Sequence, residues 1–360
     1  MKETHSKEPH SNEAHSNEPH SNELHSKETL LEIRDLRTSF RVKGEYYAAV
    51  DGINLDIYKN EVFAIVGESG CGKSATALSL SKLHNTTYTR IEGSVFLNGV
   101  DLIKLNENQI NKVRGKDIGM IFQDPLSALN PLHKIGRQIE ESLVYHTSLG
   151  LNDRKMRALE LLQEVGMTNP ELTYNQLPHE LSGGMRQRVV IAIALSCKPE
   201  LLIADEPTTA LDVTIQAQIL DLMRKLQKDN QTSIILITHD LGVVAEMADR
   251  VAVMYAGQIV EVAECEQIFD NPKHPYTRSL MASIPSISDT TDRLHVIQGM
   301  VPSLQYMPRT GCRFSHRTKW IPEDAHESTP TYHEVEEGHY VLCSCYKNFH
   351  FDTNEIAEVK

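Results

Sequence analysis

The sequence predicts an α/β fold, with either one large α/β unit plus an appendage or two modest domains. Three observations support this prediction. Residues 61–66 (EVFAIV) form a short apolar run typical of a buried strand, and a glycine-rich stretch and a candidate helix follow directly. A second apolar run, residues 201–204, ends in two adjacent carboxylates. The length of 360 residues exceeds that of one typical domain.

Composition and charge exclude two classes of protein. The chain is 40% hydrophobic and 24% charged, with a formal charge of −13, which is typical of a soluble globular protein. A protein that binds nucleic acids through bulk charge needs a basic surface, so we exclude that class. No apolar run reaches the roughly 18 residues that a membrane-spanning helix requires. The 6 cysteines, without a signal-peptide pattern, favour reduced thiols in a cytoplasm.

Residues 1–29 are predicted to form a disordered tail, because few apolar side chains are present to offset the entropy of ordering. The histidines of this tail recur at every fifth position: His5, His10, His15, His20 and His25. A histidine-rich tract can bind zinc, nickel or copper. The alternative is a solvated tail without a ligand.

Residues 67–74 match the phosphate-loop pattern G-x-x-x-x-G-K-S between a predicted strand and a predicted helix. Glycines let successive backbone N–H groups turn toward phosphate oxygens, and the helix N-terminus adds partial positive charge. We expect Lys73 to contact the β- and γ-phosphates and the Ser74 hydroxyl to bind Mg²⁺. The predicted ATP-binding residues of the loop are Gly67, Glu68, Ser69, Gly70, Cys71, Gly72, Lys73 and Ser74.

Cys71 stands within this loop, close to a predicted helix N-terminus, where a thiol can be activated. One hypothesis is that alkylation of Cys71 blocks ATP binding. The alternative is that Cys71 is merely a small packed residue.

The apolar run 201–204 precedes Asp205 and Glu206. We expect Asp205 to hold Mg²⁺ and Glu206 to polarise an attacking water. Adjacent carboxylates at a strand end are otherwise common in solvated loops, but the phosphate loop favours a nucleotide site. Together the two segments predict ATP hydrolysis.

Residues 181–188 (LSGGMRQR) precede an apolar stretch that is predicted to be helical, so their hydroxyl and backbone donors would face phosphate. With this segment the sequence resembles the ATP-binding-cassette family, whose signature is LSGGxxQR. The resemblance covers about residues 30–265 and implies the P-loop cassette fold, a mixed sheet core plus a helical subdomain, with a small C-terminal extension. It continues, in the family's order, with Gln123 after an apolar strand, Asp212 in TTALD and His239 in ITHD.

The resemblance implies that two cassettes close head to tail, so that ATP on the phosphate loop of one subunit meets the signature of the other. It implies catalytic roles for Glu206, His239 and Gln123, with His239 steadying the γ-phosphate. Asp212 would lie at the dimer interface. The signature residues would be Leu181, Ser182, Gly183, Gly184 and Gln187, and the Mg²⁺ ligands Ser74, Gln123 and Asp205.

Adenine in this family usually stacks on an aromatic residue upstream of the phosphate loop. Tyr46 and Tyr47 are both candidates for this role here. The alternative is that such a ring merely packs on the sheet.

Four stretches resemble the ATP-binding subunits of oligopeptide, dipeptide and nickel importers: PHELSGGMRQR, FQDPLSALNP, ALDVTIQAQIL and NPKHPYTRSL. Residues 266–360 resemble the C-terminal extension of that subgroup, and the DVTIQAQIL and VPSL elements are more similar to its D-type subunit. The helical pattern of residues 154–166 belongs to a helical subdomain, about residues 124–185, that contacts the membrane partner in this family.

This resemblance implies a peripheral ATPase on the cytoplasmic face of the cell membrane that powers peptide uptake. Its partners would be two transmembrane permease subunits, a second, F-type ATPase and, indirectly, an extracellular binding protein. A nickel or metal-chelate importer is the alternative. A soluble cassette ATPase acting on ribosomes or DNA is disfavoured, because the chain has one cassette and no coiled-coil insertion.

Members of the subgroup often carry four extension cysteines associated with an iron–sulfur cluster. Here Cys312 and Cys343 remain, Thr318 and Lys319 stand in place of Cys-Pro, and Ala325 or His326 replaces the third cysteine. Four thiolates are the usual requirement, so we expect no iron–sulfur cluster. Another metal site remains open, completed by Cys345, His316 or His326.

Overall fold

The computed structural model describes residues 28–209, 211–283 and 297–351. The expected tail lies outside the described residues as far as residue 27, and Thr29 already begins the first strand. None of the described helices has the length and apolar character that a membrane span requires.

The described residues form two β-sheets. The main sheet has 8 strands in the order β11-β12-β10-β9-β3-β8-β7-β6, and the second has 4 in the order β2-β1-β4-β5. The central strands β9, β3, β8, β7 and β6 run parallel, whereas β9, β10, β12 and β11 pair antiparallel. The bounds of the strands in the main sheet are β3 Val62–Val66, β6 Ile118–Ile121, β7 Leu201–Asp205, β8 Ser233–Thr238, β9 Arg250–Tyr255, β10 Gln258–Glu264, β11 Tyr332–Glu336 and β12 His339–Leu342.

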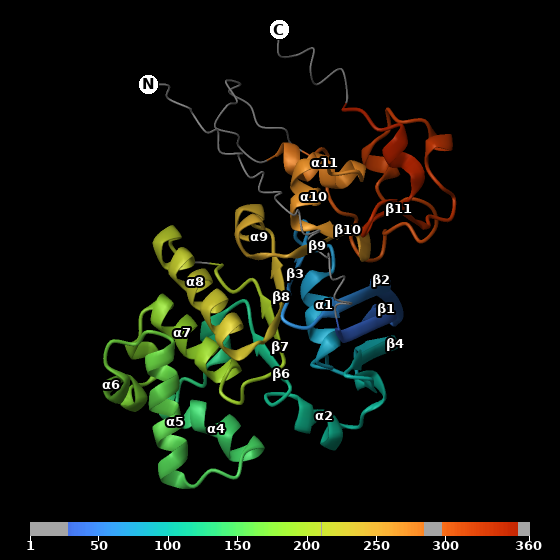
Figure 1. Cartoon of the computed structure of the whole chain (residues 1–360). Coiled ribbons are helices and arrows are strands. Elements are labelled where there is room, and N and C mark those ends of the chain that lie inside the picture. The colour runs from blue at the N-terminus through green and yellow to red at the C-terminus, as the bar shows by residue number, and fades with distance from the viewer. Residues whose placement is uncertain (1–27, 210, 284–296, 352–360) are drawn as a thin grey trace, which may run out of the picture.

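The second sheet is antiparallel and lies beside helix α1, as Figure 1 shows. Side chains of α1 such as Ala77 and Leu80 fill the space between the two sheets. The bounds of its strands are β1 Thr29–Val42, β2 Glu45–Tyr58, β4 Thr89–Leu97 and β5 Val100–Asp101.

Some helices of the described residues pack on the main sheet, and others form a separate lobe on the side away from β1 and β2 (Figure 1). Strands β3, β7 and β8 are buried on both faces, which explains why their sequences are continuous apolar runs. The bounds of the helices are α1 Lys73–Leu80, α2 Glu107–Val113, α3 Pro125–Ala128, α4 Ile135–His146, α5 Leu151–Glu164, α6 Pro170–Asn175, α7 Gly183–Ala194, α8 Val213–Asn230, α9 Leu241–Met247, α10 Cys265–Asp270 and α11 Pro275–Ala282. The mixed sheet with its helices confirms the predicted α/β fold.

The helical lobe contains α4, α5 and α6 and packs against α7. Helix α5 buries Ala158, Leu161 and Leu162, whose spacing of three and four residues places them on one face. Helix α6 begins at Pro170 because the Asn169 side chain accepts the Leu172 N–H and proline fits the first helical position.

The C-terminal segment is built onto the main sheet. Strand β12 pairs with β10, and β11 extends the sheet to its edge. Tyr255 of β9 and Val260 of β10 share one hydrophobic cluster with Phe314 and Cys312 of the extension. The extension therefore continues the core.

Candidate nucleotide-binding site

The strand order brings the predicted site residues to one edge of the sheet. Strands β3, β8, β7 and β6 are adjacent and parallel, so their carboxyl ends meet there. The phosphate loop follows β3, Asp205 ends β7, and His239 follows β8. Gln123 lies two residues beyond β6. Ligands of open α/β sheets bind at this edge.

The phosphate loop, residues 67–74, is closed around the Lys73 side chain. Lys73 is 5% exposed, and its Nζ donates hydrogen bonds to the carbonyls of Gly67 at 2.7 Å and Glu68 at 3.1 Å. Gly72 precedes α1 with a φ of 114°, and a Cβ there would lie 2.6 Å from the Ala49 carbonyl oxygen. Only glycine fits this position. No side chain caps α1, which suits an anion at the helix start.

Ser74 and Asp205 form the pair that was predicted to hold Mg²⁺. The Ser74 hydroxyl donates to Asp205 Oδ1 at 3.1 Å. Burial raises the pKa of Asp205, and the Ser74 hydrogen bond opposes that rise. A hydroxyl and a carboxylate are the oxygen ligands that Mg²⁺ prefers, so the residues present fit this ion.

Glu206 is the centre of a hydrogen-bond network. Its Oε2 accepts the Gln123 amide at 2.8 Å and the Thr209 hydroxyl at 3.0 Å, while His239 Nδ1 lies 3.2 Å from Oε1. Burial alone would raise the pKa of Glu206, but the hydrogen bonds from Thr209 and His239 outweigh it and the pKa is lowered. The side chain is therefore a carboxylate at neutral pH. Its backbone φ is 49°, an uncommon conformation for a non-glycine residue that often marks functional sites.

Two of the predicted catalytic residues, Gln123 and His239, thus meet at the carboxylate of the third, Glu206, and Thr209 joins them. Thr209 was not among the predicted residues. Thr209 stands three positions after Glu206 and is the second residue of the Thr208-Thr209 pair. This short spacing was the sequence feature that could have identified it.

The signature segment surrounds the start of α7. Ser182 is exposed and caps the helix, its Oγ accepting the Met185 N–H at 3.3 Å. A Cβ on Gly184 would lie 2.8 Å from Ile215 Cγ2 of α8, a helix that Asp212 caps by accepting the Ile215 N–H at 3.0 Å. Ile215 therefore links the signature to Asp212.

The other signature residues divide between surface and interior. Gly183 is exposed, whereas Leu181 and Gln187 are buried within the chain. Gln187 Nε2 has no hydrogen-bond partner within the described part of the chain. Leu181 and Gln187 support the segment from inside.

Tyr46 and Tyr47 are neighbours on β2, so their rings lie on opposite faces of the strand. The Arg90 guanidinium covers the Tyr46 ring at 3.8 Å from its centroid. The Tyr47 hydroxyl donates to Glu45 at 2.7 Å.

Cys71 is not the activated thiol that its place in the loop suggested. Its side chain is 1% exposed, and burial raises its pKa, an effect that outweighs the nearby Lys73 charge. The expectation of an activated thiol is wrong because the loop folds over the side chain. Cys71 is better described as a small packed residue.

We therefore expect Cys71 in the folded chain to react with iodoacetamide roughly tenfold or more slowly than in the unfolded chain, with or without ATP. Peptide mapping by mass spectrometry measures this, with the half-buried Cys265 as an internal comparison. Rapid labelling of Cys71 that ATP suppresses would contradict the buried geometry.

The C-terminal segment reaches the phosphate loop, which the sequence did not predict. Arg317 Nη1 lies 2.6 Å from Glu68 Oε2, and Arg317 Nη2 lies 3.3 Å from Glu68 Oε1. The Glu68 N–H donates to the Tyr276 hydroxyl at 2.8 Å. Arg313 pairs with Asp51 and donates to the Ala256 carbonyl.

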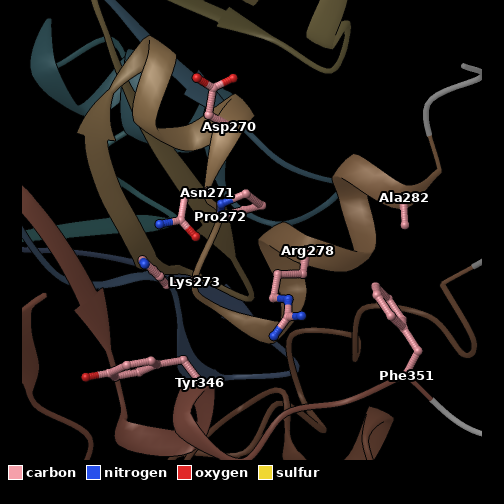
Figure 2. Close-up of a pocket in the computed structure, with 8 residues that line it drawn as sticks. All are labelled: Asp270, Asn271, Pro272, Lys273, Arg278, Ala282, Tyr346 and Phe351. Carbon is pink, nitrogen blue, oxygen red and sulfur yellow. The ribbon is translucent and has the colours of Figure 1, made fainter. Parts of the chain in front are cut away.

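Of the candidates for another metal site, the structure brings together Cys312, His326, Cys343 and Cys345. His316 is not in this group of described residues. A surface pocket of about 410 Å³ lies within residues 266–360, between α10–α11 and the segment that contains Tyr346 and Phe351 (Figure 2). Its lining includes Lys273, Arg278 and Tyr346 but none of the predicted nucleotide-site residues.

Comparisons with known proteins agree on the family. The profile of the ABC transporter family matches residues 50–209, and that of the oligopeptide/dipeptide transporter C-terminal region matches residues 260–319. The oligopeptide transport ATP-binding protein OppD of Lactococcus lactis subsp. cremoris is 49% identical over 330 residues, covering 91% of this chain and 98% of that protein. AppD of Bacillus subtilis, another oligopeptide transport ATP-binding protein, is 50% identical over 320 residues, covering 89% and 97%.

Solved structures agree with the fold. The dimeric ATP-binding cassette MJ0796, in a post-hydrolysis state bound to ADP and Pi, superposes with a TM-score of 0.59 at 28% identity. The match covers 66% of this chain and 99% of that one.

Proposed function

Since the chain belongs to the ABC transporter family, we propose that it is the ATP-hydrolysing subunit of an oligopeptide importer. The observation that carries ATP hydrolysis is the meeting of Gln123, Thr209 and His239 at the Glu206 carboxylate, beside the phosphate loop. The assignment of peptides as the substrate rests on relatives that are about half identical to this chain over nearly its whole length.

Each site residue then has a proposed role. Gly67–Ser74 hold the phosphates of ATP through backbone N–H groups and Lys73. Ser74, Asp205 and Gln123 hold Mg²⁺, which supplies charge stabilisation to the phosphate oxygens. Glu206, kept ionised by its hydrogen bonds, orients and polarises the attacking water, and His239 steadies the γ-phosphate and that water. Either Tyr46 or Tyr47 stacks on adenine.

A second ATPase subunit completes the site. Ser182 and Gly183 are exposed in the single chain, and Val213, beside Asp212, is 83% exposed. These exposed residues leave the signature and the start of α8 free for a partner to cover. Head-to-tail closure would bring Ser182 and Gly184 to the partner's ATP. We propose an F-type subunit as this partner and assign the present chain to the D type.

The helical lobe is the proposed contact with the two transmembrane permease subunits. Several of its large apolar side chains are exposed in the single chain, which suits a surface that a partner covers: Leu126, Leu132, Tyr145, Leu151, Met156 and Leu172. Leu132 alone is 84% exposed. An ATPase docked through this lobe, about residues 124–185, would lie peripherally on the cytoplasmic face of the membrane.

We further propose that residues 30–265 act as the ATPase domain and residues 266–360 as the importer-type extension. The contacts of Arg317 and Tyr276 with the phosphate loop support an extension that positions the ATP site. No iron–sulfur cluster is proposed in it, because the ligand set differs from four thiolates.

Uptake measurements test the proposed function. In cells that lack the gene, the wild-type chain is expected to restore uptake of labelled oligopeptides and to co-purify with integral membrane proteins. Glu206→Gln should not restore uptake, whereas Glu246→Gln, which changes an exposed carboxylate on α9, should. Restored nickel uptake without peptide uptake would replace peptides by nickel as the substrate. A chain absent from the membrane fraction would refute a role in transport.

A further inference from the structure

Four metal-ligating side chains of the extension meet at one point. Cys312, His326, Cys343 and Cys345 each offer one ligand atom, and these atoms all lie within 4.8 Å of one another. The three cysteines are buried and the histidine is half-buried. They come from three separate segments: the loop before η3 (Ser315–Arg317), the end of η4 (Glu323–Ala325), and the turn from β12 into η5 (Ser344–Lys347).

The His326 side chain gives a second, independent indication that a ligand binds here. Both of its ring nitrogens, Nδ1 and Nε2, are buried and lack a hydrogen-bond partner among the described residues. Buried polar atoms normally have partners, because an unsatisfied one costs free energy. Coordination of a metal ion by one nitrogen would satisfy it.

The surroundings of Cys343 resemble those of a metal-bound thiolate. Its Sγ accepts the Glu327 N–H at 3.4 Å. The Glu327 carboxylate in turn accepts the Ser344 N–H at 3.0 Å and lies 2.6 Å from His333 Nε2. Such an outer shell of hydrogen bonds orients the residues that bind a metal. Cys343 also holds a φ of 73°, an unusual conformation for a residue with a side chain.

The separation of the ligand atoms decides between one ion and a cluster. Tetrahedral zinc has Zn–S bonds of about 2.3 Å, which place its sulfur ligands about 3.8 Å apart. An iron–sulfur cluster spreads its ligands further, because they bind different iron atoms. Ligand atoms within 4.8 Å of one another fit one ion and do not fit a cluster.

We propose that Cys312, His326, Cys343 and Cys345 bind one Zn²⁺ ion in a closed structural site. Three thiolates and one imidazole are a common ligand set of structural zinc, and the burial of the sulfur atoms leaves no open position for catalysis. The ion cross-links three segments of an extension whose own hydrophobic core is small.

The metal content of the full-length chain tests this proposal independently of transport. The protein is purified without a nickel column, under exclusion of air, from cells grown with both iron and zinc. Elemental analysis is expected to find about one zinc per chain in a colourless preparation. Substituted with Co²⁺, the same chain should show thiolate-to-cobalt charge-transfer absorbance, which tail histidines cannot produce.

Matched full-length variants separate this site from other sources of metal. Cys345→Ser should lose zinc and the cobalt–thiolate absorbance, whereas Cys197→Ser, in the helical part of the ATPase, should keep both. A variant with all five tail histidines changed to alanine should also keep both. His326→Cys should retain zinc and, substituted with Co²⁺, should show stronger thiolate-to-cobalt absorbance, because a fourth thiolate replaces the imidazole. An unchanged cobalt spectrum would exclude His326 as a ligand even if Cys345→Ser fails to fold.

Three results would overturn the proposal. Iron and sulfide in the stoichiometry of a cluster, with a brown colour, would show that the site is an iron–sulfur centre. A metal-free chain without cobalt–thiolate absorbance would show that the three cysteines form no metal site. Zinc that disappears only when the tail histidines are replaced would assign the metal to the tail.

Discussion

Glu206→Gln is expected to leave ATP binding intact and to lower ATP hydrolysis by roughly 10²–10⁴-fold, the usual contribution of a general base. The Glu206 carboxylate receives hydrogen bonds from Gln123 and Thr209 and lies 3.2 Å from His239, so the side chain is fixed and ionised. The amide of glutamine has nearly the same shape but carries no charge. It therefore cannot polarise the water, while Lys73 and the loop glycines still hold the phosphates.

The measurement pairs ATPase rates of the assembled transporter with the affinity of the same preparation for ATP. Glu246→Gln is the matched control, because it removes one carboxylate from an exposed position on α9. If Glu206→Gln hydrolyses ATP at the wild-type rate, Glu206 is not the catalytic carboxylate. If it instead fails to bind ATP, the carboxylate has a structural role in the phosphate site.

Arg317→Met is expected to destabilise the chain by about 1–3 kcal/mol, the usual cost of leaving buried acceptors without their donor. The Arg317 side chain is 2% exposed and pairs through both terminal nitrogens with Glu68, whose side chain is 28% exposed. It also donates to the carbonyls of Gln298, Ile297 and Gly299. Methionine preserves much of the volume but leaves the carboxylate and the carbonyls without these donors.

Because Glu68 belongs to the phosphate loop, the same variant should also bind ATP more weakly. Denaturant unfolding and ATP titration measure the two effects, and Arg137→Met, at an exposed position of α4, is the control. Pairing Arg317→Met with Glu68→Gln should recover part of the lost stability, since the double variant leaves no unpaired carboxylate. A loss below about 1 kcal/mol, typical of an exposed ion pair, would contradict a stabilising role for the Arg317–Glu68 contact.

The nucleotide site was largely predictable because its parts are local. The glycine pattern of residues 67–74, the carboxylates after an apolar strand and LSGG before a helix each carry their chemistry within a few positions. Parallel strands then assemble them at one edge without further information. His239 and Gln123 required the family resemblance, since a single histidine or glutamine after a strand has no distinctive spacing.

The contacts of the extension could not be predicted in this way. Arg317 and Glu68 are 249 residues apart, and no periodicity relates them. The burial of Cys71 depends on how the loop folds over it, which the pattern G-x-x-x-x-G-K-S does not specify. For Cys345 and His326 the sequence offered candidates but left His316 equally open, because three segments must fold before their ligand atoms meet.

The pairing of β12 with β10 has a consequence for any shortened form of this chain. Cutting after residue 265 would remove β11 and β12 and leave β10 as an unpaired edge with open N–H and C=O groups. It would also uncover Tyr255 and Val260, which the extension now shields. A free edge strand beside exposed apolar side chains favours aggregation. We therefore expect the extension to protect the ATPase against aggregation, and a chain without it to precipitate rather than work as a smaller enzyme.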